Sequence, residues 1–73
     1  MSKLPSIPPK KVLKALIKTG FYIDRKSGSH VYLKHQNGRR TSVSIHPRPL
    51  FKGTLHKILK QTELSIEELK KLI

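Results

Sequence analysis

The strongest constraint on the fold is a pair of alternating segments, HVYLKH and RTSVSIH, on either side of Gln-Asn-Gly. Alternation of apolar and polar residues predicts two half-buried strands, and the Asn-Gly between them predicts a hairpin. A two-residue loop would set apolar residues opposite polar ones on both faces, whereas a three-residue loop with Gly38 left-handed and a bulge would not. We therefore predict the three-residue loop, with the pairs Val31–Val43 and Leu33–Thr41.

The segment FYIDR, residues 21–25, predicts a first strand, and RKSGS after it predicts a loop. The same parity predicts the cross-strand pairs Phe21–Leu33, Tyr22–Tyr32, Ile23–Val31 and Asp24–His30. One face of all three strands would then be apolar and buried, and the other would be open. The open face would carry Tyr22, Asp24, His30, Tyr32, Lys34, Arg40, Ser42 and Ser44.

Three helical segments flank these strands. PPKKVLKALIKTG has Pro9 where a first-turn proline is tolerated, Gly20 as a C-terminal stop, and an apolar stripe of Val12, Leu13, Leu16 and Ile17. TLHKILKQT is capped by Thr54 in our prediction and turns Leu55, Ile58 and Leu59 inward. SIEELKKLI has Ser65 and Glu68 in capping-box spacing, with an apolar stripe of Ile66, Leu69, Leu72 and Ile73. Between these two segments, Glu63 stands where a glycine would end a helix more comfortably.

The resulting order is α-β-β-β-α(-α), which belongs to the α+β class. A three-stranded antiparallel sheet would be covered by helices on one face only. A chain of 73 residues supports one small hydrophobic core. We therefore predict a single domain over residues 1–73.

Charge indicates the kind of partner. The chain has 16 Lys and Arg against 4 Asp and Glu, a formal net charge of +12, and three of the four acids follow residue 62. Such a field attracts phosphate backbones or anionic surfaces. Without cysteine, the chain has no disulfide and no thiolate nucleophile. No apolar run approaches the roughly 20 residues of a membrane span, so we expect a cytoplasmic protein with no membrane partner.

His30 is the best candidate for chemistry among the four histidines. It follows Gly28 and Ser29, which would let a backbone come close, and in the predicted register it faces Asp24, which would hold the ring. The alternative is that His30 is an ordinary residue of a polar surface. His35 and His56 are most simply surface residues, and His46 is expected to bind phosphate or to close the third strand.

The residue types restrict the reaction. A two-metal nuclease needs several carboxylates that converge on one site, and this chain offers neither those nor a metal-binding spacing. Cleavage of a phosphodiester would therefore be metal-independent and need no cofactor. RNA supplies its own nucleophile, the 2′-hydroxyl, and asks only for a base, an acid and nearby cations. DNA has no such hydroxyl.

Two segments at a fixed separation, GSHVYL and HPRPLFKGTLHKILKQTELSIEEL, resemble the HicA family of toxins from toxin–antitoxin pairs. The resemblance implies a double-stranded-RNA-binding-domain-like fold, cleavage of mRNA with His30 as the catalytic residue, and a HicB-like antitoxin that blocks the site. The family's Lys-Gly-Thr motif corresponds to Lys52, Gly53 and Thr54. Two positions depart from the family pattern: Ser44 replaces a frequent proline and Glu63 a frequent glycine. We expect both departures to affect backbone shape more than chemistry.

Affinity for RNA should come from cationic side chains that contact phosphates. The predicted set is Lys34, Arg39, Arg40, His46, Arg48 and Lys52. Two other functions stay open from the sequence. One is an RNA-binding module of the same fold that does not cleave, and the other is a DNA-binding regulator, because TLHKILKQTELSIEELKKL also fits a helix-turn-helix.

Overall fold

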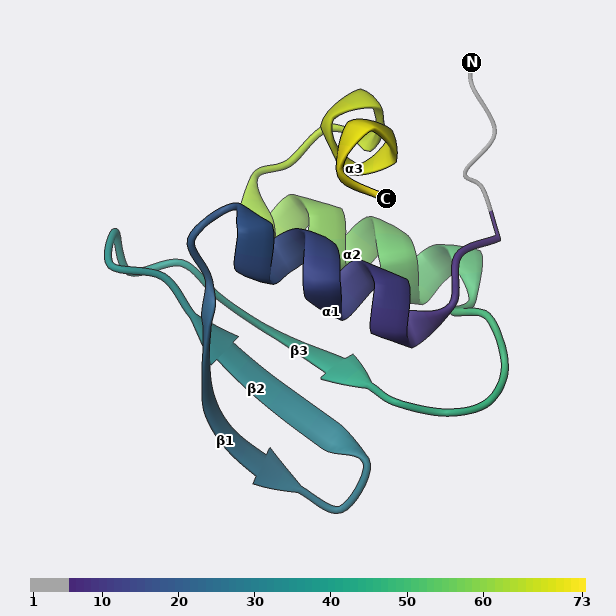
Figure 1. Ribbon diagram of the computed structural model, residues 1–73, viewed down its shortest axis with the longest axis horizontal. Coiled ribbons are helices and arrows are strands. Elements are labelled where there is room, and N and C mark those ends of the chain that lie inside the picture. The colour runs from purple at the N-terminus through teal and green to yellow at the C-terminus, as the bar shows by residue number, and fades with distance from the viewer. Residues whose placement is uncertain (1–5) are drawn as a thin grey trace.

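The computed structural model describes residues 6–73 and has the predicted α+β order. Its elements are α1 (Pro9–Lys18), β1 (Tyr22–Ser27), β2 (His30–Lys34), β3 (Arg40–Ser44), α2 (Lys52–Thr62) and α3 (Ile66–Leu72). The three strands form one antiparallel sheet in the order β1-β2-β3. Helices α1 and α2 cover one side of the sheet, and α3 lies beyond them (Figure 1). Among residues 6–73, no helix covers the other side of the sheet.

The β2–β3 hairpin has the predicted register. Val31 lies opposite Val43, and Leu33 lies opposite Thr41. All four of these side chains are buried, so parity places the alternate residues of both strands on the open face. Gly38 has a φ of 94°, which confirms the left-handed position predicted for the three-residue loop.

The β1–β2 hairpin differs from the prediction. The expected pairs Phe21–Leu33, Tyr22–Tyr32, Ile23–Val31 and Asp24–His30 are wrong. Strand β1 continues to Ser27, which lies opposite His30, and only Gly28 and Ser29 form the turn. Gly28 has a φ of 60°, which such a tight turn requires. A bulge between Ile23 and Arg25 absorbs the change in register.

Burial also fails to extend to the first strand. Every residue of β1 is exposed, and Ile23 keeps 40% of its surface although it lies opposite the buried Leu33. The reason is the position of the helices, since α1 and α2 both contact β3 while β1 is the far edge of the sheet (Figure 1). The prediction of one buried face across all three strands is therefore wrong at β1, where only Phe21, just before the strand, enters the core.

The helices keep most of their predicted contacts. In α1 the core positions are Val12, Ala15 and Leu16, while the predicted Ile17 is 45% exposed. In α2 the inward residues Leu55, Ile58 and Leu59 are buried as predicted. The predicted Thr54 cap is wrong, because the helix begins at Lys52 and Phe51 is its N-terminal neighbour.

The break between α2 and α3 follows the sequence closely. Glu63 adopts a left-handed conformation with φ 59° and ψ 30°, where a glycine would be more comfortable. The Ser65 hydroxyl accepts from the Glu68 backbone N–H, and the Glu68 carboxylate accepts from the Ser65 backbone N–H. These two hydrogen bonds hold the pKa of Glu68 below its usual 4.5, and the bond from the Ser65 backbone N–H has the larger effect.

His35 is a structural residue, contrary to its predicted surface position. Its ring lies edge-on to Phe21 with 5.0 Å between centroids, and its Nε2 lies 3.2 Å from the Thr19 carbonyl oxygen. The ring also fills the space over Gly20, where a Cβ would lie 2.8 Å from Nε2. Gly20 itself has a φ of 103°, so both the backbone conformation and the nearby His35 ring require a glycine at this position. His56 is exposed, as predicted.

Candidate active site

The open face of the sheet gathers polar and cationic side chains from β2 and β3. Three cross-strand pairs supply them: His30–Ser44, Tyr32–Ser42 and Lys34–Arg40. Because the intervening residues are buried, this face is fixed by strand parity and not by loop conformation. The face therefore offers a rigid platform for the candidate catalytic histidine.

His30 is exposed and held by a neighbouring strand. Its Nδ1 lies 2.9 Å from the Ser44 hydroxyl oxygen, so the two form a hydrogen bond across the β2–β3 ladder. The Tyr32 ring lies 6.4 Å away on the same face, centroid to centroid. Because the bond to Ser44 uses Nδ1, Nε2 is the ring nitrogen left for a substrate.

The turn before His30 is also tied to β3. The Ile45 backbone N–H donates to the Ser29 carbonyl oxygen at 2.8 Å, directly after Ser44. The Gly28 and Ser29 positions are therefore fixed relative to the strand that holds the imidazole. No atom lies within 4 Å of a Cβ built on Gly28, so this glycine serves the turn and leaves open space beside it.

Asp24 does not lie opposite the imidazole. Its carboxylate Oδ2 is 3.5 Å from the Lys34 Nζ, in an ion pair that is partly exposed to solvent. The bulge in β1 removes it from the predicted pairing with His30, whose partner in that strand is Ser27. The side chain that hydrogen-bonds to the imidazole is Ser44, a position expected from the sequence to affect backbone shape more than chemistry.

The sequence contained the signal for Ser44. The register that pairs Val31 with Val43 also pairs His30 with Ser44, one residue further on each strand. Cross-strand neighbours on one face are close enough for a serine hydroxyl to reach an imidazole. A serine opposite a candidate catalytic histidine is therefore a chemical feature as well as a structural one.

The predicted cations lie in three places. Lys34 and Arg40 are on the open face, and Arg40 is exposed. Arg25, which the sequence reading left out, joins them with its guanidinium 4.6 Å from the centre of the Tyr32 ring. Arg39 is directed elsewhere, since its Nη1 donates to the Thr62 carbonyl at the end of α2. Its role in binding RNA stays a prediction.

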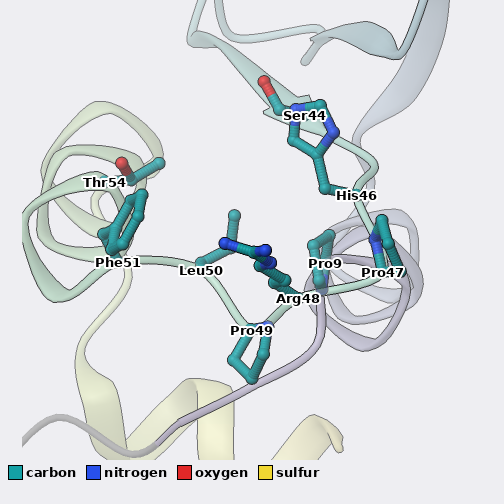
Figure 2. Close-up of a pocket in the computed structure, with 9 residues that line it drawn as sticks. All are labelled: Pro9, Ser44, His46, Pro47, Arg48, Pro49, Leu50, Phe51 and Thr54. Carbon is teal, nitrogen blue, oxygen red and sulfur yellow. The ribbon is translucent and has the colours of Figure 1, made fainter.

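Of the remaining predicted cations, His46 and Arg48 are exposed on the connection from β3 to α2, and Lys52 is exposed at the first position of α2. This connection lines an open pocket of about 700 Å³, which we call the β3–α2 pocket. Figure 2 shows the Phe51 ring on one side of the pocket and Ser44 with His46 on the other. Phe51 keeps 80% of its surface exposed. The pocket adjoins the candidate active site, because Ser44 belongs to both.

The described part of the chain has neither a cluster of metal ligands nor a membrane-spanning helix. Residues 6–73 bring no three His, Asp or Glu side chains together in a group that fits a metal ion. Within the same range, no helix has the length and apolar content to cross a membrane.

Comparison with known proteins identifies the kind of chain. A family model described as the HicA toxin of bacterial toxin–antitoxin pairs matches residues 9–64. The match begins at the first residue of α1 and ends just before the α3 cap, so it includes the whole sheet and the β3–α2 pocket. No curated protein sequence matches the chain.

Proposed function

The chain belongs to the HicA family of toxins from bacterial toxin–antitoxin pairs, and we propose that it is a metal-independent endoribonuclease that cleaves mRNA. The observation that carries the proposal is the exposed His30 imidazole, held at Nδ1 by the Ser44 hydroxyl 2.9 Å away on an open basic face. A general acid or base needs this combination of accessibility and orientation. An mRNA substrate places the reaction in the cytoplasm.

The proposed reaction uses the 2′-hydroxyl of the RNA as its nucleophile. A base takes the 2′-hydroxyl proton, the 2′-oxygen bonds to the neighbouring phosphorus, and the bond from phosphorus to the 5′-oxygen breaks. That 5′-oxygen takes a proton, so the products are a 2′,3′-cyclic phosphate and a 5′-hydroxyl. Nε2 of His30 carries out one of these proton transfers, and water completes the other.

The bond to Ser44 suits either direction of transfer. When the Nδ1–H group donates to the Ser44 oxygen, Nε2 is unprotonated and acts as the base. When the ring is protonated at both nitrogens, Nδ1–H still donates to the Ser44 oxygen, and Nε2 carries the proton that the leaving 5′-oxygen needs. In both cases Ser44 fixes the ring plane, which is the orienting role that we had predicted for Asp24.

Cations beside the imidazole would bind the RNA backbone and stabilise the charge that develops on the phosphate. Lys34, Arg40 and Arg25 on the open face, with Arg48 and Lys52 beyond it, support this role. Each phosphate of a single strand that the protein neutralises adds about 0.7 to the slope of log affinity against log salt. Binding should therefore weaken steeply between low and moderate salt.

We also propose a HicB-like antitoxin as the protein partner. The family is defined by toxin–antitoxin pairs, and the open face is the surface that a partner must cover to block His30. Such a partner needs carboxylates that face Lys34 and Arg40, because like charges across an interface are costly. The complex should thus dissociate faster as salt rises.

The test uses a labelled RNA strand incubated with the wild-type protein in EDTA. We expect cleavage to continue, products to end in cyclic phosphate, and a single 2′-deoxynucleotide at a cleaved position to abolish cleavage there. Inhibition by EDTA, or full cleavage at the deoxy position, would overturn the mechanism. RNA that binds and stays intact would favour the non-catalytic module, and preference for duplex DNA would favour the helix-turn-helix regulator.

A further inference from the structure

We propose that the β3–α2 pocket binds one nucleobase of the RNA beside the phosphate at His30, with the Phe51 ring as its stacking surface. The inference rests on the proposed function, because it assigns part of the substrate to a second site. It gives the enzyme a contact with the base in addition to the phosphate contacts of the sheet.

Packing in the core does not explain why residue 51 is a phenylalanine. It is the most exposed large apolar residue among residues 6–73, with 80% of its surface accessible, and it is absent from the hydrophobic core. Its position before α2 uses only the backbone, since its carbonyl oxygen accepts from the Leu55 N–H. An aromatic ring left in solvent at the edge of a pocket is available for a ligand.

The pocket combines apolar walls with polar edges. Pro9, Pro47, Pro49 and Leu50 supply apolar surface around the ring. Ser44, His46, Arg48 and Thr54 supply hydrogen-bonding groups in the same lining. Its volume of about 700 Å³ lies within the range of about 300–1,000 Å³ usual for small-ligand sites. A nucleobase, flat and apolar on its faces and polar along its edge, matches this lining.

The link to the active site is Ser44. The Ser44 hydroxyl oxygen lies 2.9 Å from Nδ1 of His30, and Ser44 also lines the pocket. A strand whose phosphate lies at the imidazole therefore passes the mouth of the pocket with its next base. The described lining contains no acidic residue and contains Arg48, so the charge favours a polyanion over an uncharged apolar segment.

Stacking on an aromatic side chain tolerates different bases, because every base has a π face. Alanine substitution of such a ring weakens binding by roughly 5- to 150-fold per base. A purine offers more stacking surface than a pyrimidine. We therefore expect tighter binding when a purine occupies the pocket.

The experiment measures binding apart from cleavage. It uses a short 2′-O-methyl oligopurine, which has no free 2′-hydroxyl, and a strand of the same length in which every base is absent. Phe51→Ala should weaken binding of the oligopurine about 5- to 150-fold and leave binding of the abasic strand unchanged. Phe51→Trp should retain the wild-type affinity. Ile17→Ala is the matched control, because Ile17 is exposed on α1 outside the pocket.

Three outcomes would overturn the base pocket. The first is oligopurine affinity of Phe51→Ala within twofold of wild type. The second is an equal loss on the abasic strand. The third is RNA affinity that does not change while neutralisation by the co-expressed antitoxin is lost, which would make the pocket a partner site. Failure of the nuclease proposal would leave these binding results unaffected, since the probe is not cleavable.

Discussion

Ser44→Ala removes the side-chain hydrogen bond that orients His30. The bond spans 2.9 Å between the Ser44 oxygen and Nδ1 on an exposed face, so its net worth is that of an ordinary hydrogen bond, about 0.5–1.5 kcal/mol. If all of this energy orients the ring in the transition state, the rate of RNA cleavage falls by roughly 2- to 13-fold. The loss should appear mainly in kcat, because the cations and the Phe51 ring, which supply most of the RNA affinity in this account, stay in place.

The assay compares initial rates of RNA cleavage by wild type, Ser44→Ala, Ser44→Thr and Asp24→Asn. Ser44→Thr keeps the hydroxyl and should retain most of the wild-type rate. Asp24→Asn should lose less than Ser44→Ala, since its carboxylate contacts Lys34 and not the imidazole. Equal rates for Ser44→Ala and wild type, or a larger loss for Asp24→Asn, would refute the positioning role of Ser44.

The other substitutions separate stability from binding. Gly20→Ala should cost about 1–3 kcal/mol and lower Tm by more than about 4 °C, because φ is 103° and the new Cβ would meet His35 at 2.8 Å. The pKa of Glu68 is lower in the folded state than its usual 4.5. The ionised carboxylate therefore stabilises the fold fully above about pH 4.5, and this stabilisation is lost as the pH falls through the folded-state pKa. Glu68→Gln can keep the capping box but does not titrate. Between pH 5 and pH 3 its free energy of unfolding, measured in urea, should therefore fall less than that of wild type. An equal fall in the two proteins would contradict this. Arg39→Ala should lower Tm through its lost bond to α2, whereas Arg40→Ala should weaken RNA binding and leave Tm unchanged.

The β2–β3 hairpin shows what the sequence alone could establish. Its alternating residues allow only one register that buries apolar side chains together, and Gly38 fits the loop which that register needs. The register also placed His30 on the open face. The periodic spacing of apolar residues likewise predicted the three helices. The spacing of Ser65 and Glu68 predicted a capping box, and the structure contains it.

The first hairpin could not be predicted in this way. Strand β1 is exposed throughout, so no buried face selects its register, and a bulge there changes the parity without any apolar signal. The misplaced Asp24 is a direct consequence. Ile23 and Ile17 were assigned to the core because they are apolar, but the helices lie over β3 and leave both residues partly in solvent.

Tertiary contacts decided the roles of two further residues. Arg39 and Arg40 are adjacent cations at the start of β3, and only the folded chain shows that one bonds to the end of α2 while the other faces solvent. The β3–α2 pocket is similar, because it joins residues from α1, β3 and α2 that no local pattern brings together.

The central claim is that His30 is the acid–base group of a ribonuclease. The most direct measurement is RNA cleavage by His30→Ala, recorded beside its thermal unfolding with wild type as reference. The exposed imidazole buries no apolar contact, so we predict an unchanged Tm, retained RNA binding and a loss of cleavage of about 10²-fold or more. Cleavage close to the wild-type rate, or a fall in Tm large enough to explain the loss, would contradict the account.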